Sequence, residues 1–167
     1  AIQNLICFYS EDGKMLFRTF EEIEQCIADF LVFEKNNEIV GISSLKFGWD
    51  RLVEIRSLGV DPRYHRQGIA TQMIRFSIER ALLQNNCDTM FVLTYAVPLF
   101  NKFGFKIVDK IQLPQKVWND CQACLHKDNC DETAMSLSLL SLKKLPEKEL
   151  SLRKQTLLKD TQRTLSF

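Results

Sequence analysis

The stretch that decides the fold reads V-E-I-R-S-L-G-V-D-P-R-Y-H-R-Q-G-I-A and runs from Val53 to Ala70. Residues 53–60 are apolar and β-branched enough to predict a buried strand. Pro62 ends that strand, because proline cannot donate a hydrogen bond to the ladder. A run with helical periodicity begins after Gly68. This strand–turn–helix order points several backbone N–H groups at one place, where the helix dipole also favours a phosphate.

The second half of this stretch resembles the acetyl-CoA-binding motif of the GNAT superfamily of N-acetyltransferases, Arg/Gln-x-x-Gly-x-Gly/Ala. Gly68 and Ala70 match it, whereas His65 stands where the family usually has Arg or Gln. An ordinary helix start would give the same local pattern, so the choice between the two depends on the rest of the sequence. The resemblance implies that acetyl-CoA is the co-substrate and that the following residues contact it: Leu58, Gly59, Val60, His65, Arg66, Gln67, Gly68, Ile69, Ala70 and Phe100.

A second block, L-F-N-K-F-G-F at 99–105, resembles the Phe-Tyr-x-Lys-x-Gly-Phe block of the same superfamily. Phe100 stands where many relatives carry a tyrosine that protonates the leaving thiolate, and a phenylalanine cannot do this. Tyr95 directly follows an apolar run at 89–94 that predicts a short buried strand. We therefore take Tyr95 as the candidate acid, with a packing role as the alternative.

Local patterns predict a mixed α/β chain. Thr19 and Glu22 form a capping box, and Asn36-Asn37 is a hairpin signal. The expected helices cover 1–9, 20–30 (with Phe20, Ile23, Ile27 and Phe30 on one face), 68–84 and 97–103, and the expected strands cover 31–35, 38–47, 51–60, 89–94, 105–110 and 133–140. This order resembles the GNAT fold, a mixed and mostly antiparallel sheet with splayed central strands. Its first strand is absent here, so we expect a preceding piece before Ala1.

Glu54 and Arg56 are two residues apart on the predicted central strand and therefore share a face. In several GNAT enzymes a glutamate at this place is the general base, directly or through water, and the resemblance implies that role for Glu54. Arg56 could bind the carboxylate of an acceptor bidentately. The two side chains could instead merely pair with each other. The resemblance also implies a strand distortion around Leu58, Gly59 and Val60 that serves as an oxyanion site.

Several longer strings resemble the short, stand-alone bacterial N-acetylglutamate synthase-like proteins. They are E-I-R-S-L at 54–58, V-L-T-Y at 92–95, L-P-Q-K-V-W-N-D-C at 113–121 and C-D-E-T-A-M at 130–135. This resemblance implies acetylation of the α-amino group of L-glutamate, a step of arginine biosynthesis. Relatives with other amino acid acceptors would share these strings. Lys116 and Trp118 are candidate acceptor-binding residues, unless Trp118 only anchors its loop to the core.

Two other functions stay open. The His65 and Phe100 departures would suit a GNAT module that binds acetyl-CoA as a sensor with little catalysis. Acetylation of a protein N-terminus or lysine is the other alternative. An acceptor groove for a peptide is open and often acidic, so Arg56 and Lys116 favour a small acidic acceptor.

The 167 residues suit one catalytic domain, expected over 1–140, and an extension over 141–167. Leu150, Leu157, Leu158 and Leu165 have helical spacing, so the extension is either an amphipathic helix docked on its own domain or on a partner, or a partly disordered tail. A formal net charge of +1 predicts no nucleic-acid or membrane partner. With no apolar span and no signal-peptide pattern, we expect a cytoplasmic protein with reduced thiols. A homodimer stays open.

The six cysteines form two groups. Cys7, Cys26 and Cys87 lie in periodic apolar segments and are expected to be buried. The others form the string Cys121-x-x-Cys124-x-His126-x-x-x-Cys130, which has the ligand types of a Cys3His zinc site. Zinc sites usually have two well-separated ligand pairs, whereas these four residues fall within ten positions. We therefore expect no metal, with a disulfide or buried thiols as the alternatives.

Overall fold

The computed structural model of the chain describes residues 1–48, 50–113, 124 and 129–143. Its helices and strands are, in chain order, α1 (Ile2–Glu11), α2 (Phe20–Gln25), β1 (Phe30–Lys35), β2 (Glu38–Phe47), β3 (Leu52–Val60), α3 (Ile69–Leu82), β4 (Thr89–Thr94), α4 (Val97–Asn101), β5 (Lys106–Ile107), β6 (Thr133–Ser138) and α6 (Leu139–Lys143). Across these residues no helix combines the length and the apolarity that crossing a bilayer requires. The predicted α/β order is confirmed.

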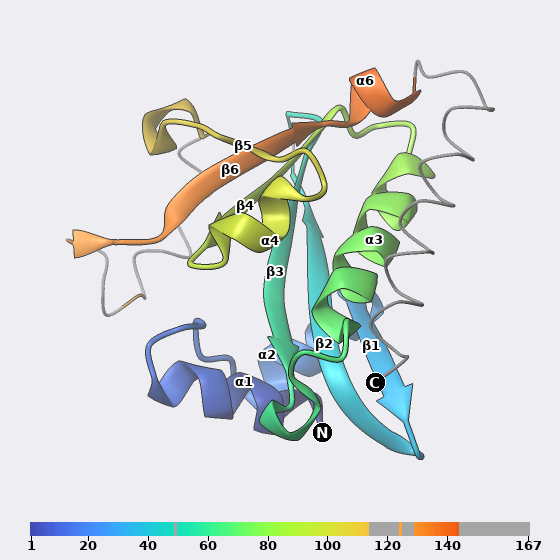
Figure 1. Cartoon of the computed structure of the whole chain (residues 1–167), viewed down its shortest axis with the longest axis vertical. Coiled ribbons are helices and arrows are strands. Elements are labelled where there is room, and N and C mark those ends of the chain that lie inside the picture. The colour runs from blue at the N-terminus through green and yellow to red at the C-terminus, as the bar shows by residue number, and fades with distance from the viewer. Residues whose placement is uncertain (49, 114–123, 125–128, 144–167) are drawn as a thin grey trace.

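The six strands form one sheet in the order β1-β2-β3-β4-β6-β5. All neighbours are antiparallel except β3 and β4, which are parallel. That parallel ladder has only three residue pairs and ends where Glu54 faces Phe91. Beyond this point β3 runs on to Val60 and β4 to Thr94, and Figure 1 shows the two strands diverging. The predicted mixed sheet with splayed central strands is confirmed.

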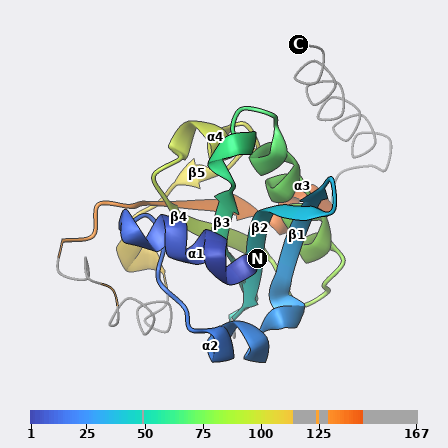
Figure 2. The same cartoon turned by 90° about the horizontal axis from the view of Figure 1, so that it is seen from below.

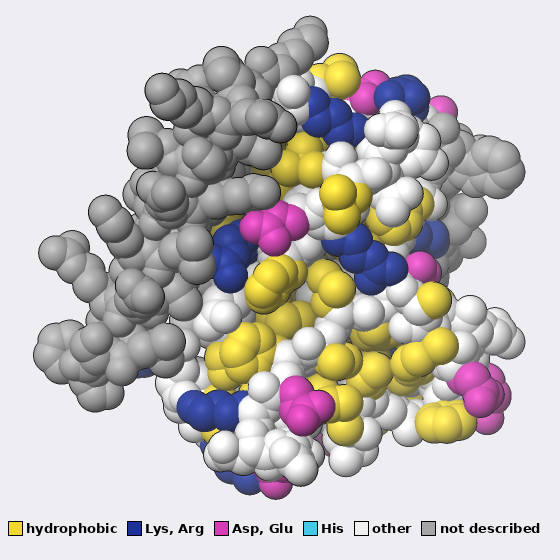
Figure 3. All heavy atoms as spheres, turned by 90° about the vertical axis from the view of Figure 1, so that its right-hand side faces the viewer, with side chains coloured by type: hydrophobic (Ala, Val, Ile, Leu, Met, Phe, Trp, Pro, Cys, Tyr) yellow, Lys and Arg dark blue, Asp and Glu magenta, His cyan; other side chains and the backbone are white. Residues whose placement is uncertain are grey.

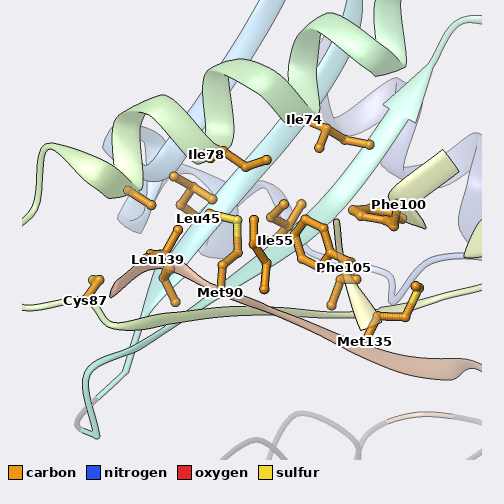
Figure 4. Close-up of a cluster of buried hydrophobic side chains, with 14 residues drawn as sticks. Leu45, Ile55, Ile74, Ile78, Cys87, Met90, Phe100, Phe105, Met135 and Leu139 are labelled. Atoms are coloured by element: carbon orange, nitrogen blue, oxygen red, sulfur yellow. The ribbon is translucent and has the colours of Figure 1, made fainter. Parts of the chain in front are cut away.

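Helices cover both faces of the sheet, with α1 and α2 on one side and α3 and α4 on the other (Figure 2). The largest core lies between α3 and the sheet (Figure 4). In it Phe100 and Phe105 meet edge to face, with ring centroids 5.2 Å apart. The predicted apolar stripe of α3 supplies Ile74 and Ile78. A smaller core under α1 centres on Ile6.

Two local signals form as predicted. The hydroxyl of Thr19 accepts a hydrogen bond from the Glu22 N–H at 3.2 Å, and the Glu22 carboxylate accepts one from the Thr19 N–H at 2.7 Å. Asn36 and Asn37 have φ values of 54° and 61°, the left-handed pair that a two-residue hairpin turn requires. The turn sets the pairing of β1 with β2 and so brings Lys35 opposite Glu38.

The second helix is shorter than predicted. It ends at Gln25 instead of continuing to residue 30, and Phe30 starts β1 opposite Ser44. Phe20 and Ile27 are 59% and 53% exposed, so the predicted apolar face is wrong for these two side chains. The chain from Phe30 forms a strand instead of a longer helix, because pairing with β2 gives it ladder hydrogen bonds across the sheet.

Two predicted elements near the C-terminal end also differ. The strand expected over 105–110 is reduced to Lys106–Ile107, because the Asp109 carboxylate accepts from the Ile111 N–H and starts a 3₁₀ turn. The strand expected over 133–140 ends at Ser138. The Ser138 hydroxyl accepts from the Ser141 N–H at 3.3 Å, which begins the short helix α6.

The cysteines expected in the interior are not all buried. Cys87 is 1% exposed and belongs to the main core, as predicted. Cys7 and Cys26 are only half-buried, so the prediction is wrong for them. Cys26 lies at the end of α2, where its Sγ–H donates to the Glu22 carbonyl at 3.0 Å, because the helix stops before that position turns inward.

Candidate active site

A β-bulge interrupts the central strand within the splayed region. Arg56 pairs with Ser44 and Gly59 with Ile42, so two residues of β3 face one of β2. The extra residue is accommodated at Ser57, whose φ is 49°. The sequence predicted a distortion over Leu58, Gly59 and Val60, and the structure begins it at Ser57. No sequence signal marked this position, because serine is not typical of left-handed backbone.

Gly59 has a different role from the bulge itself. A Cβ atom built on it would lie 2.9 Å from Cε2 of Tyr9, so only glycine lets the ring of α1 lie on β3. The Tyr9 hydroxyl donates to the Val60 carbonyl at 2.5 Å and lies 2.9 Å from His65 Nε2. Burial raises the pKa of the Tyr9 phenol, so it keeps its proton at neutral pH. Sequence reasoning missed Tyr9.

His65 is held at the end of the central strand. Its Nε2 lies 2.8 Å from the Val60 carbonyl oxygen. That oxygen can only accept, so Nε2 carries the hydrogen in this arrangement. The ring therefore links the end of β3 to the turn that follows, a role that the sequence did not predict. The role predicted for His65, contact with acetyl-CoA, stays a prediction.

The turn between β3 and α3 opens its amides at one point. Arg66 and Gly68 have φ values of 61° and 76°, and the first main-chain bond of α3 runs from Gln72 N to Gly68 O at 3.0 Å. Within the described part of the chain, the N–H groups of 68–71 have no acceptor. Such a cluster of amides at a helix N-terminus fits a diphosphate.

The side chains around this turn suit an anion. The one acidic group of the turn, Asp61, accepts from Arg63 at 2.8 Å, and this bond holds its carboxyl pKa below the usual value. Lys35 reaches the turn from β1 and donates to Gln67 Oε1 at 2.7 Å. Ile69 is buried, and its Cγ2 would lie 2.9 Å from a Cβ on Gly41, so that glycine seats the start of α3 on the sheet.

The predicted base Glu54 and the predicted acceptor-binding residue Arg56 lie where β3 and β4 part. Glu54 is in the last parallel pair, and its Oε2 lies 3.4 Å from Arg56 Nε. The two side chains are 14% and 13% exposed, so water screens the pair only weakly. The predicted common face is confirmed. Lys46 lies directly opposite Glu54 on β2.

Arg56 also lines a hollow of about 250 Å³ between α2 and the sheet. Arg18 and Lys46 line the same hollow, together with the acidic Glu22 and Asp29, so its lining carries three cationic and two acidic side chains. Sequence reasoning missed Arg18 and Lys46. The pairing of β2 with β3 could have indicated Lys46, but nothing in the sequence marks Arg18, which lies between helices.

Tyr95, the candidate acid, and Phe100, which stands where many relatives carry the acid, lie in different surroundings. Tyr95 is 47% exposed just after β4, and its hydroxyl donates to Asp131 Oδ1 at 2.6 Å. That bond raises the pKa of Tyr95 above its usual value, so the phenol stays protonated. Phe100 is 1% exposed within the main core, so it does not line an open surface as expected for a cofactor contact. Phe100 is buried because α4 places its ring against Phe105 in the main core.

Some predicted residues lie outside the described part of the chain. These are the acceptor candidates Lys116 and Trp118 and the metal candidates Cys121 and His126. Cys124 and Cys130 are described, and both are half-buried. Among the described residues, no three metal-binding side chains come together. The choice between metal, disulfide and buried thiols for this cluster stays open.

A mixed sheet that splays beside a turn with open amides fits a phosphate-bearing ligand at the end of the central strand. The chain belongs to the acetyltransferase (GNAT) family, whose family model matches residues 3–105. It is an N-acetyltransferase that uses acetyl-CoA, and the resemblance drawn from the sequence is confirmed. The open amides and basic surroundings of the turn fit the diphosphate of this co-substrate.

Similar proteins narrow the class. An uncharacterized N-acetyltransferase of Chlorobaculum tepidum is 34% identical over 83% of this chain and 89% of its own length. An amino-acid acetyltransferase of Aliivibrio fischeri is 30% identical over 70% of this chain, which spans only 26% of that protein. The amino-acid acetyltransferase of Mycobacterium tuberculosis is 26% identical over 72% of this chain and 70% of its own length.

Solved structures share the fold. The N-acetylglutamate synthase of Neisseria gonorrhoeae, complexed with coenzyme A and N-acetyl-glutamate, aligns with a TM-score of 0.73 at 24% identity. The alignment covers 83% of this chain and 32% of that one. A Mycobacterium tuberculosis protein in complex with CoA aligns with a TM-score of 0.70 at 23% identity. The alignment covers 82% of this chain and 91% of that one.

Proposed function

We propose that this enzyme transfers the acetyl group of acetyl-CoA to the α-amino group of an amino acid, with L-glutamate as the first candidate. One observation carries the proposal. The Glu54–Arg56 pair lies where the central strands part, beside a hollow that Arg18 and Lys46 also line. A base next to a hollow with three cationic and two acidic side chains suits an acceptor that has both an amine and carboxylates.

Glu54 would act as the general base. An α-amino group has a pKa near 8 or above, so most of it is protonated and unreactive at neutral pH. Glu54, directly or through one water, would take that proton as the nitrogen attacks the thioester carbonyl. Arg56, whose Nε lies 3.4 Å from Glu54 Oε2, would orient the carboxylate.

The cationic side chains of the hollow, Arg18, Lys46 and Arg56, would select the acceptor, while the two acidic side chains on the same lining leave it a net charge of only about +1. A dicarboxylic amino acid brings two negative charges, and a guanidinium can hold one carboxylate with two parallel hydrogen bonds. Arg56 lies between the base and the hollow, so it can fix the distance from the carboxylate to the reacting nitrogen. Arg18 and Lys46 would hold the second carboxylate. Lys116 and Trp118 stay candidates for closing the site.

Tyr95 would return a proton to the sulfur. The leaving thiolate needs one when the C–S bond breaks, and the raised pKa of Tyr95 keeps its phenol protonated until then. The hydroxyl now donates to Asp131, so it would have to turn from that carboxylate to the sulfur. Main-chain N–H groups at the Ser57 bulge would stabilise the oxyanion meanwhile.

The test is an acceptor panel. The full chain is incubated with acetyl-CoA and single amino acids or peptides, and free thiol is followed. We expect thiol release with glutamate to exceed release with glutamine, aspartate and lysine-containing peptides. Release with a neutral amino acid alone would refute the acidic acceptor. Binding of acetyl-CoA without release on any acceptor would instead support the regulatory module.

The role in arginine biosynthesis follows only if glutamate is the acceptor. The cytoplasmic location and a homodimer likewise stay predictions.

A further inference from the structure

Val60 is the last residue of β3, and its main-chain groups face the open side of the strand. The next residue, Asp61, donates its N–H to the Val40 carbonyl of β2 at 2.8 Å. The main-chain groups of successive strand residues point to opposite sides, so the N–H and the carbonyl of Val60 point away from β2. The ladder between β3 and β4 already ends at Glu54. Val60 is therefore the end of the open edge, directly before the turn that leads to α3.

Two side chains from distant parts of the chain meet at the Val60 carbonyl. The Tyr9 hydroxyl of α1 donates to this oxygen at 2.5 Å, and His65 Nε2 lies 2.8 Å from it. A carbonyl oxygen has two lone pairs, so it can accept from both donors. Tyr9 Oη and His65 Nε2 are themselves 2.9 Å apart. The three groups join α1, the end of β3 and the turn at one point.

The backbone at Gly59 lets the phenol reach this point. A Cβ atom on Gly59 would lie 2.9 Å from Cε2 of Tyr9 and 3.3 Å from Cε of Met15, so both side chains lie over this residue. Burial raises the pKa of the Tyr9 phenol, and the hydroxyl therefore stays a donor at neutral pH. The packing of the ring and the bond of the hydroxyl are separable, because phenylalanine would keep the first and lose the second.

We propose that Tyr9 is a positioning residue for acetyl-CoA. A co-substrate whose diphosphate lies at the turn and whose acetyl group lies where β3 and β4 part passes Val60. Tyr9, together with His65, holds the Val60 peptide at one position relative to the turn. The Val60 N–H lies 3.4 Å from Tyr9 Oη, a long and weak bond, so it can still donate to a ligand. This role concerns the co-substrate and does not depend on which acceptor the enzyme uses.

The first test replaces Tyr9 by phenylalanine and measures the Kd for acetyl-CoA by titration calorimetry on the full chain. Loss of the hydrogen bond that orients the Val60 peptide should raise this Kd about three- to tenfold. Tyr64→Phe is the matched control. It removes a phenol hydroxyl from the turn itself, and its ring keeps the contacts with Lys35 and Arg63. The control should keep the Kd within about twofold.

His65 tests the other donor to the same carbonyl. His65→Ala should raise the Kd for acetyl-CoA by a similar factor. His65→Gln should restore most of the affinity, because a side-chain amide N–H can also donate to the Val60 carbonyl. The double variant Tyr9→Phe/His65→Ala should lose less than the product of the two single effects, since both act through one peptide. Effects that multiply would mean that the two residues act separately, which contradicts shared positioning.

A further control separates stability from positioning. Phe76→Ala removes a ring from the hollow between β1 and α3, on the face where Figure 3 shows hydrophobic side chains gathered. It should lower Tm and leave the Kd for acetyl-CoA within about twofold. A Kd for Tyr9→Phe that matches that of the unchanged chain would overturn the proposal. An equal rise of Kd in Tyr9→Phe, Tyr64→Phe and Phe76→Ala would also overturn it, because the effect would then be a general loss of stability.

Discussion

The two halves of the central strand β3 have different neighbours. From Leu52 to Glu54 the strand is paired on both sides, with β2 and with β4. From Ile55 to Val60 it is paired with β2 alone, and the bulge at Ser57 interrupts even that ladder. Arg51 and Asp88 join the starts of β3 and β4, whereas Tyr9 and His65 hold the far end.

The difference teaches how one strand can both stabilise the fold and serve the chemistry. The doubly paired half has its backbone groups satisfied by neighbouring strands, so its main chain offers no open edge to a ligand. The singly paired half keeps one main-chain edge open, and we propose that acetyl-CoA binds beside it. Glu54 lies at the boundary, where rigid pairing can hold a catalytic carboxylate next to that open edge. Variants in the singly paired half should therefore change the kinetic constants, whereas variants near the start of the doubly paired half should change stability alone.

The largest effect is expected at the boundary itself. Glu54→Gln removes the proposed base, so kcat at neutral pH should fall about 10²- to 10⁴-fold. The loss should shrink near about pH 9.5, where more of the acceptor amine is deprotonated. Turnover is measured across pH, with the acetyl-CoA Kd as the control for folding. Losses of equal size at all pH values would remove Glu54 as the base.

Arg56→Ala tests the singly paired half, two residues beyond the boundary at Glu54. Loss of a charge-assisted, bidentate contact should raise KM for glutamate about 10- to 100-fold while KM for acetyl-CoA stays nearly unchanged. Steady-state kinetics with each substrate varied in turn gives both values. If both constants rose together, Arg56 would be supporting the strand and not the acceptor.

Gly68→Ala tests the turn that follows the open half. At φ 76° a Cβ costs about 1–2 kcal/mol, and the strain falls on the amides that face the diphosphate. KM for acetyl-CoA should rise about tenfold. Gly104→Ala is the matched control, since its φ is 89° but it lies after α4, away from the turn. The control should lose stability and keep its KM; a similar rise in both variants would exclude a specific role for the turn.

The smallest effect is expected in the doubly paired half. Arg51 holds the carboxyl pKa of Asp88 below its usual value, so the pair stabilises the fold above about pH 4 and is lost as pH falls through the lowered pKa. Asp88→Asn should lower Tm by less than about 5 °C at neutral pH and by less again at about pH 3, with kcat unchanged. Thermal melts at both pH values check this, and a change in kcat would contradict the separation of the two halves.

Local chemistry explains why much of the fold could be predicted. The Thr19 capping box and the Asn36-Asn37 turn act within four residues, so they form as the sequence indicates. The turn before α3 is equally local, because Gly68 supplies the left-handed backbone that opens the amides. Glu54 and Arg56 share a face through strand alternation alone. The predicted length of α2 was wrong because the pairing of β1 with β2, which begins at Phe30, joins residues that are distant in the chain.

The sequence by itself determined the element order, the amide turn and the face that carries Glu54 and Arg56, because each depends on backbone preferences over a few neighbouring residues. Only the tertiary structure decided that the bulge begins at Ser57, that Tyr9 and His65 meet at the Val60 carbonyl, and that Arg18 and Lys46 line the hollow with Arg56. These contacts join residues that are distant in the chain, and their partners follow from strand register and helix docking.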